Sequence, residues 1–298
     1  MKISVVTPSL NQGAYLEATL RSLLSQDYPD LELIVIDGSS TDQSVEIIRR
    51  YEPFLTHWES ERDRGQSHAL NKGFSHMTGD IWGWLNSDDV YEPGVLSRVA
   101  RAFEENADAG VVYGDCVYVE ADGETVIEKF RSEPYSRLRH LAHRFIAQPS
   151  CFFRRSLVPP ELREDFHYCM DYDLWLKTAA RGVKFLYVPE LFSRYRLHEE
   201  SKSAGALVAL HAEIVDRIYR PLLQSGASRE ERRAIGLAAG DMIDQLNSLG
   251  ARGALLKTLL FRVWEARTPP TAALLGLALQ ALLGPRAVRL IQRLKGRH

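Results

Sequence analysis

Cysteine is scarce in this chain, and no charge of one sign is in clear excess. The three cysteines in 298 residues stand far apart, without the spacing of a metal site or of a disulfide framework. This distribution fits a reducing compartment. The formal net charge of -2 gives no support for a protein that binds nucleic acid.

Long apolar runs are missing as well, and none reaches the length of a membrane span. The opening residues 1–8 lack the length and cleavage site of a signal peptide, so they predict a first strand instead. Hydrophobic residues make up 45% of the chain and charged residues 26%, as in ordinary globular proteins. We therefore expect a cytoplasmic protein of one or two domains.

Two nucleotide-binding fingerprints are also absent. No G-x-G-x-x-G follows the first strand and no G-x-x-x-x-G-K-[ST] occurs anywhere, which argues against a dinucleotide-binding fold and a P-loop. Strand and helix patterns nevertheless alternate, which predicts an α/β fold with βαβ units and a mostly parallel sheet. The strand patterns lie at residues 3–6, 31–36, 54–58 and 81–85, and the helical patterns at 16–24, 42–48, 68–74 and 93–103.

The pattern changes after residue 109. Strand-like runs at 111–113, 117–119, 125–130, 150–153 and 184–188 surround a helical stretch at 172–180, and residues 121–123 predict a hairpin turn. We expect this part to extend the same sheet. From about residue 205 the chain becomes helical, so the sequence predicts a domain over 1–204 and a helical extension over 205–298.

The helical extension has patterns at 230–249, 254–264 and 271–283, followed by a basic stretch with apolar residues at 286–298. One interpretation is a set of helices that pack on the main domain. The alternative is an amphipathic helix at a membrane surface, which would make the protein peripheral at the inner face of a membrane.

An acidic pair, Asp88 and Asp89, follows the apolar run at 81–85. Two adjacent carboxylates at the end of a buried strand are costly unless a cation neutralises them. A divalent metal that prefers oxygen, Mg²⁺ or Mn²⁺, fits this position and takes further ligands from phosphate and water. The alternative is a solvated loop in which Asp89 helps to cap the helix near Pro93.

Polar clusters follow three of the predicted strands, at residues 7–11, 37–42 and 86–89. In an open parallel sheet ligands bind beyond the carboxyl ends of the strands, so we expect these clusters to form one crevice. There Asp37 could accept a hydrogen bond from a base and Asp88 from ribose hydroxyls. Asp37 could equally be a turn residue before Gly38.

At these residues the chain resembles glycosyltransferase family 2, whose members are nucleotide-sugar transferases of the Rossmann-like GT-A fold. The order and spacing of the matching segments are specific, and they cover the predicted domain over 1–204. The segments are residues 4–9, 33–42, 63–73, 88–89, 170–176 and 195–198.

The resemblance implies an inverting transfer of sugar from a nucleotide-diphosphate sugar to a hydroxyl of a glycan or lipid-linked acceptor, in surface polysaccharide or glycoconjugate biosynthesis. It also implies roles for residues of this chain. The donor-binding residues are Thr7, Pro8, Ser9, Asn11, Asp37, Ser39, Asp63, Arg64, Gly65, Gln66, Asn71 and, beside the ribose, Asp88. Asp89 would bind the metal, alone or together with Asp88, and His198 would approach the metal or the diphosphate.

By the same resemblance Asp171 is the catalytic base, which accepts the proton of the attacking hydroxyl. The alternative is an N-cap of the helix at 172–180, and the two roles are compatible. Asp173 is a lesser candidate. His198 could also be a hydrogen-bonded residue without a metal.

Further residues could border the site. Gln148 precedes a strand near the expected acceptor pocket, and Trp82 and Trp84 are either core residues or a platform for a sugar face. The chain departs from the family pattern where Asn86 and His68 stand at positions that often carry Asp, and where Met170 stands at a position that often carries an acid.

Two other functions fit the same features. A nucleotidyltransferase of related architecture would make nucleotide sugars, but it calls for a glycine-rich basic loop after the first strand, which residues 11–13 match poorly. A non-catalytic protein that binds nucleotide sugars would bind the donor without hydrolysis or transfer.

Overall fold

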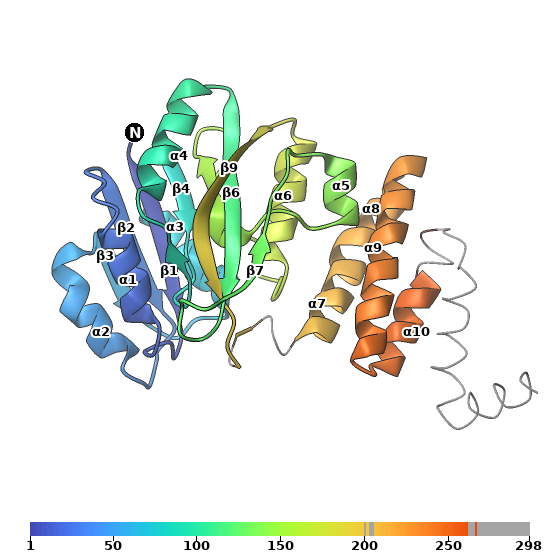
Figure 1. Cartoon of the computed structure of the whole chain (residues 1–298), viewed down its shortest axis with the longest axis horizontal. Coiled ribbons are helices and arrows are strands. Elements are labelled where there is room, and N and C mark those ends of the chain that lie inside the picture. Colours follow the sequence, from blue (N-terminus) through green and yellow to red (C-terminus); the bar gives the residue numbers. More distant parts are fainter. Residues whose placement is uncertain (200, 203–205, 262–265, 267–298) are drawn as a thin grey trace, which may run out of the picture. The chain divides into compact units, whose positions relative to one another are not determined.

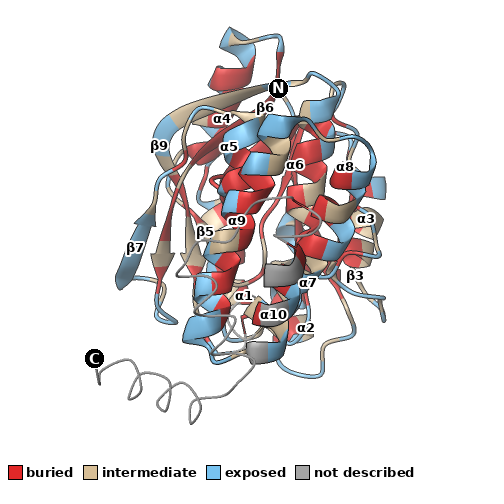
Figure 2. Ribbon diagram, turned by 90° about the vertical axis from the view of Figure 1, so that its right-hand side faces the viewer, coloured by how far each residue is buried: buried red, intermediate tan, exposed pale blue. Residues whose placement is uncertain are grey.

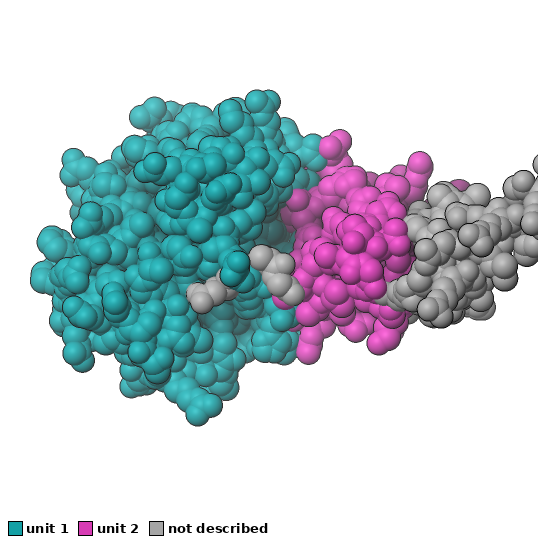
Figure 3. Space-filling view, turned by 60° about the horizontal axis from the view of Figure 1, so that its bottom comes forward, with its two compact units in different colours: residues 1–135, 145–204 teal, residues 136–144, 205–298 magenta. Residues whose placement is uncertain are grey.

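The computed structural model describes residues 1–199, 201–202, 206–261 and 266. The chain forms two compact units, coloured separately in Figure 3: residues 1–135 with 145–204, and residues 136–144 with 205–298. The second unit therefore includes a segment, 136–144, that the sequence-based boundary assigns to the first domain.

Among the described residues, no helix is both long enough and apolar enough to cross a bilayer. The helices expected at 271–283 and 286–298 lie outside the described residues, and so does the expected membrane-surface helix.

The first unit is built on one mixed sheet (Figure 1). Its strands are β1 (Ile3–Ser9), β2 (Leu31–Asp37), β3 (His57–Ser60), β4 (Ile81–Trp84), β5 (Val90–Tyr91), β6 (Ala109–Val119), β7 (Val126–Phe130), β8 (Cys151–Arg154) and β9 (Lys184–Arg196). They follow the order β3-β2-β1-β4-β8-β6-β9-β5, and β7 pairs with β6 outside this path. The first four strands are parallel neighbours, as predicted.

Five α-helices belong to the first unit: α1 (Leu16–Leu24), α2 (Ser44–Tyr51), α3 (Gln66–Ser75), α4 (Val95–Glu105) and α6 (Met170–Ala180). Alternation along the strands decides which helices cover which face. The face that carries Val5 and Val35 forms a core with α1, α2 and α4. The opposite face lies against α3, because a Cβ at Gly73 would lie 2.4 Å from Val6 Cγ1 and 3.1 Å from Ile36 Cγ1.

The second half of the sheet is mixed. β8 runs antiparallel to β4 and to β6, whereas β9 runs parallel to β6. The runs predicted as two strands at 111–113 and 117–119 form the single strand β6, and the hairpin predicted at 121–123 joins it to β7. A sheet flanked by helices confirms the predicted α/β class, but its second half is more antiparallel than the mostly parallel sheet that the sequence predicted.

The second unit contains α5 (Arg137–Ala142), α7 (Leu207–Ile214), the π-helix η3 (Val215–Tyr219), α8 (Arg220–Gln224), α9 (Arg229–Ser248) and α10 (Arg252–Leu260). A capping box begins α9, since Ser228 and Glu231 each accept a hydrogen bond from the other's backbone N–H. Glu231 also pairs with Arg137 of α5, 3.0 Å away. Figure 2 shows the buried residues as a red stripe along α9.

Candidate active site

The carboxyl ends of β1 and β2 carry the first part of the site. Ser9 pairs with Asp37 across the two strands, and Asp37 pairs with Ser60 of β3. The Asp37 carboxylate is fully buried and accepts hydrogen bonds from the backbone N–H and hydroxyl of Ser40, at 2.8 and 2.5 Å, and from the Ser60 hydroxyl, at 2.7 Å. Asp37 therefore shapes the loop after β2, as the turn interpretation predicted.

The loop after β1 is tied to the loop after β2. The backbone N–H of Asn11 donates to the Ser40 hydroxyl at 2.8 Å, and the Asn11 side-chain oxygen accepts from the Thr41 N–H at 2.8 Å. Asn11 and Ser39 have left-handed backbone with φ of 53° and 67°. The hydroxyls of Thr7 and Ser9, both on β1, are buried and have no hydrogen-bond partner among the described residues. Because both hydroxyls are enclosed, their contact with a donor stays a prediction.

A third loop, between β3 and α3, lies against the second. Asp63 accepts a hydrogen bond from the Gly65 N–H at 2.8 Å, and its Oδ2 would lie 2.7 Å from a Cβ at Gly38. Gly65 has φ of 117° and directly precedes α3. Asp63 thus lies beside the loop after β2, and the contact of Asp63 and Gly65 with a donor stays a prediction.

Asn71 and Arg64, which the sequence also predicts to bind the donor, contact the segment at residues 162–164. The Asn71 amide group donates to the Leu162 carbonyl at 2.8 Å and accepts from the Leu162 N–H at 2.9 Å. Arg64 pairs with Glu164 at 2.5 Å. Asn71 therefore fixes the segment around Leu162 onto α3, and its contact with a donor stays a prediction.

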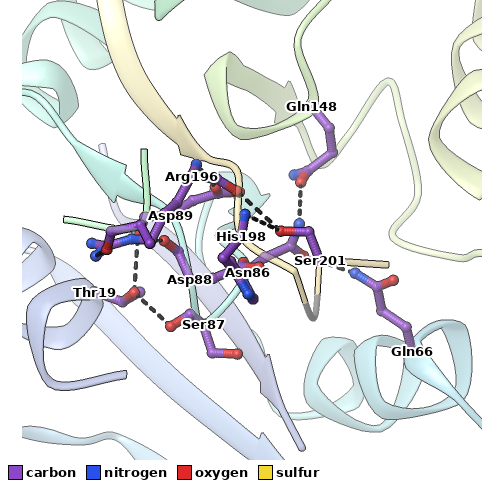
Figure 4. Close-up of polar contacts among 11 residues, drawn as sticks. Thr19, Gln66, Asn86, Ser87, Asp88, Asp89, Gln148, Arg196, His198 and Ser201 are labelled. Carbon is purple, nitrogen blue, oxygen red and sulfur yellow. Dashed lines mark hydrogen bonds and ion pairs between the residues drawn. The ribbon is translucent and has the colours of Figure 1, made fainter. Parts of the chain in front are cut away.

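A relay of side-chain amides crosses the site (Figure 4). Gln66 donates to the Asn86 side-chain oxygen at 2.8 Å, Asn86 donates to Gln148 at 3.1 Å, and Gln148 donates to the Trp84 carbonyl at 2.8 Å. Lys202 donates to Gln66 at 3.0 Å. Asn86, a departure from the family pattern, is thus the central member of a neutral relay that joins three elements.

The adjacent residues Asp88 and Asp89 face different surroundings (Figure 4). The Asp88 carboxylate lies 3.1 Å from His198 Nε2, and its side chain is 20% exposed. Asp89 is 1% exposed, and its Oδ1 accepts the Arg196 backbone N–H at 3.0 Å. Burial, and then the neighbouring Asp88, raise the pKa of Asp89 well above its usual range.

Arg196 holds this acidic segment in place. Its Nε donates to the Asp88 carbonyl at 2.9 Å, and its Nη1 donates to the Ala121 carbonyl in the β6–β7 turn at 2.8 Å. Its guanidinium carbon lies 4.9 Å from the centre of the Tyr15 ring, which itself lies 4.3 Å from the His198 ring. Arg196 and Tyr15 therefore set the positions of Asp88 and His198.

The donor set of Asp88 and His198 fits a divalent cation. A carboxylate and an imidazole converge, and His198 Nδ1 is buried without a hydrogen-bond partner among the described residues. The sequence assigned the metal to Asp89 and the ribose to Asp88. Asp88 is partly exposed and contacts His198, but Asp89 Oδ2 is also buried without a hydrogen-bond partner in the part of the chain that the structure describes, so the assignment of the metal to Asp89 stays a prediction.

Asp171 lies in the first turn of α6, where the N-cap residue is Cys169, so the predicted capping role is wrong. The Asp171 carboxylate accepts from the Tyr172 N–H at 2.7 Å. Burial raises the pKa of Cys151 at the start of β8, and the charge of Asp171 adds to this effect. Asp173 pairs with Lys177 at 2.6 Å and is engaged in that ion pair.

Trp82 and Trp84 are buried and stack on Phe153, which confirms that they belong to the core.

Two residues of the site were not predicted from the sequence. Tyr15 and Lys202 were missed, because neither belongs to a recognisable motif. Only the fold brings them to the site, from the loop before α1 and from the segment after β9.

Comparisons with known proteins identify the family of the chain. The family model of glycosyl transferase family 2 matches residues 4–158. A PGL/p-HBAD biosynthesis glycosyltransferase of Mycobacterium bovis is 30% identical over 72% of this chain and 81% of its own length. An uncharacterised glycosyltransferase of Nostoc sp. is 33% identical over 38% of this chain, and the match spans 36% of that protein.

Solved structures share the fold at low identity. Staphylococcus aureus TarS in complex with UDP-GlcNAc has a TM-score of 0.62 and 18% identity, over 95% of this chain and 92% of that one. A mannosyltransferase from Pyrobaculum calidifontis in complex with GDP-Man and Mn²⁺ has a TM-score of 0.58 and 20% identity, over 94% of this chain and 87% of that one. The sequence match and the shared fold lead to one conclusion: the chain belongs to glycosyl transferase family 2.

Proposed function

We propose that this glycosyltransferase is an inverting enzyme that uses a nucleotide-diphosphate sugar and depends on Mg²⁺ or Mn²⁺. The observation that carries the proposal is the 3.1 Å approach of Asp88 to His198. This pair lies at the sheet edge where β1, β2 and β4 end, which is where ligands bind in open α/β sheets. Asp88 and His198 would hold the cation, and Asp89 would support them through Arg196.

Donor binding would use the loops at the same edge. Thr7 and Ser9 of β1 would border the base and ribose, and Arg64, which is exposed and pairs with Glu164, would turn to the phosphates when the donor binds. The structures with the same fold contain UDP-GlcNAc in one case and GDP-Man with Mn²⁺ in another. These complexes support a donor of this chemical class.

Asp171 would act as the general base. It would accept the proton of the acceptor hydroxyl while that oxygen forms a bond to the anomeric carbon. The bond from the anomeric carbon to the phosphate oxygen breaks on the opposite side, and its electron pair leaves with the nucleoside diphosphate. A bound divalent cation supplies positive charge that stabilises this leaving group.

The acceptor would be a hydroxyl of a glycan or a lipid-linked molecule in surface polysaccharide or glycoconjugate biosynthesis. The name of the mycobacterial relative assigns it to PGL/p-HBAD biosynthesis, which supports a biosynthetic transfer. We place the reaction in the cytoplasm.

The substitution Asp171→Asn tests the base. We expect sugar transfer to fall by a factor of about 10² to 10⁴, while donor affinity measured by calorimetry stays within about twofold. Asp173→Asn is the matched control, because Asp173 lies two residues further along α6 and pairs with Lys177. Full turnover in Asp171→Asn would reject the assignment.

Calorimetry with a panel of nucleotide sugars tests donor and metal together. We expect one donor to bind with Mn²⁺ and much more weakly after chelation with EDTA. Equal affinity with and without the metal would overturn the metal dependence but leave the transfer itself standing. Release of pyrophosphate from a nucleoside triphosphate would indicate a nucleotidyltransferase instead.

A further inference from the structure

A second group of possible metal ligands lies on the edge strand β3 and at the end of α3. His57 and Glu59 are two residues apart on β3, so their side chains project from the same face of the strand. His76 directly follows α3 as its C-cap residue. Its ring stacks on the His57 ring, with a centroid distance of 3.7 Å and an interplanar angle of 16°.

The three side chains converge on one point. Each offers one ligand atom, an imidazole nitrogen or a carboxylate oxygen, and these atoms all lie within 4.8 Å of one another. His57 Nε2 is buried without a hydrogen-bond partner among the described residues, and it lies 3.8 Å from Glu59 Oε2. His76 is exposed, so an ion can reach the group from solvent.

Lys72 neutralises the Glu59 carboxylate. Its Nζ lies 2.5 Å from Glu59 Oε1 and 3.5 Å from Glu61 Oε2. A metal ion that binds Glu59 can take over this neutralising role while Lys72 remains paired with Glu61.

We propose that His57, Glu59 and His76 form a transition-metal site, best suited to Zn²⁺, that is separate from the sugar-transfer site. Two imidazole nitrogens and one carboxylate are a ligand set typical of zinc with a fourth position for water. Such softer donors differ from the oxygen-rich sets that Mg²⁺ and Mn²⁺ prefer. The ion would fasten the edge strand to the end of a helix.

The proposed zinc site and the sugar-transfer site lie at opposite ends of α3. Gln66 begins α3 and contacts Asn86 at the transfer site, whereas His76 follows the other end of the helix. The ten residues of α3 correspond to a length of about 15 Å. Zinc at His76 would therefore lie at the amino-terminal edge of β3, away from the edge where Asp88 and His198 meet.

Titration with Co²⁺, whose visible absorption becomes much stronger when protein ligands bind it in a four-coordinate site, tests the proposal. The full chain is first treated with EDTA and then kept in excess Mg²⁺, which occupies the transfer site. We expect one Co²⁺ per chain, displaced by Zn²⁺, and a higher melting temperature with Zn²⁺. His57→Ala and His76→Ala should each weaken Co²⁺ binding at least about tenfold.

Two controls make the result specific. His143→Ala removes another exposed histidine, one that pairs with Asp241 in the second unit, and should bind Co²⁺ as the parent chain does. Asp88→Asn should also keep the Co²⁺ spectrum, because Asp88 belongs to the transfer site. Since His76 is exposed, His76→Ala without metal should melt at the parent temperature.

Three results would overturn the proposal. They are unchanged Co²⁺ binding in the double variant His57→Ala/His76→Ala, loss of the spectrum in Asp88→Asn, and no binding by the folded parent chain. None of these results bears on sugar transfer, which is measured separately with Mg²⁺ or Mn²⁺.

Discussion

At the scale of single residues, Asp88 and Asp89 have identical side chains but different surroundings. Asp88 is partly exposed and contacts His198, whereas Asp89 is enclosed and accepts a backbone N–H from β9. A buried carboxylate without a full set of partners prefers the protonated form, in agreement with the raised pKa of Asp89. This difference is the basis for proposing Asp88 as the metal ligand and Asp89 as its support.

This division predicts opposite results for substitutions at the two positions. Asp88→Asn should weaken Mn²⁺ binding at least about tenfold with an unchanged melting temperature. Asp89→Ala should lower the free energy of unfolding by about 1–3 kcal/mol, because the buried Arg196 N–H loses its acceptor. Calorimetric Mn²⁺ titration and urea denaturation measure the two effects. A fully stable Asp89→Ala that has lost Mn²⁺ would return the metal to Asp89.

Residue types at the site were predictable from the sequence, but their orientations were not. The carboxyl edge of a parallel sheet is a general place for polar ligand-binding residues, and the three predicted clusters do meet there. The direction of each side chain depends on distant partners, such as Arg196 for Asp89 and Leu162 for Asn71. Spacing within a motif carries no information about those partners.

At the scale of elements, the regular βαβ half was predictable and the mixed half less so. Strands β1, β2 and β4 follow from their apolar runs, since buried parallel strands read as nearly continuous apolar segments. The long strand β6 includes Gly114 and Asp115 between its apolar runs, and this interruption suggested two strands. The interruption is tolerated because Phe192 and the Glu190 carbonyl fill the space beside Gly114.

Gly73 gives a prediction for the packing of α3 on the sheet. Alanine is the better helix former by about 1 kcal/mol, yet a methyl group at Gly73 would clash with Val6 and Ile36. Such overpacking costs about 1–3 kcal/mol, so Gly73→Ala should be destabilising overall. Urea denaturation followed by the fluorescence of the buried Trp82 and Trp84 measures the change.

The matched control for this substitution is Ser75→Ala, an exposed position on the same helix. A surface substitution of this kind should change the free energy of unfolding by no more than about 0.5 kcal/mol. If Gly73→Ala proved as stable as Ser75→Ala, α3 would have room to move away from the sheet.

At the scale of the whole molecule, one buried carboxylate links folding to pH. Glu32 of β2 is 4% exposed and accepts hydrogen bonds from the Ser4 hydroxyl and from the hydroxyl and N–H of Thr78. Burial acts to raise the pKa of Glu32, but hydrogen bonds from Lys2, Ser4 and Thr78 lower it to about 2. The contribution of the Glu32 carboxylate to the stability of the folded state is therefore fully present above pH 4.5, and it disappears as the pH falls toward 2.

Glu32→Gln should remove the part of the pH dependence of the free energy of unfolding that Glu32 contributes. At pH 7 we expect the variant to be less stable by about 2 kcal/mol, the scale of hydrogen bonds to a charged group. The difference from the parent chain should shrink between pH 4.5 and pH 2 in urea denaturation. Asp108→Asn, which removes a solvent-exposed ion pair with Lys184, is the control and should show little change at any pH.

The β6–β7 turn has a consequence for protein engineering. Its polar, glycine-containing tip would normally be chosen for an epitope tag or a fluorophore. Here the tip is fastened to Arg196 through the Ala121 carbonyl, and a side chain at Gly123 would meet the guanidinium at 2.8 Å. We expect a label inserted there to displace Arg196 and thereby Asp88, so that it lowers sugar transfer without touching the substrates. A ligand-binding segment inserted at the same turn could make the transfer rate depend on that ligand.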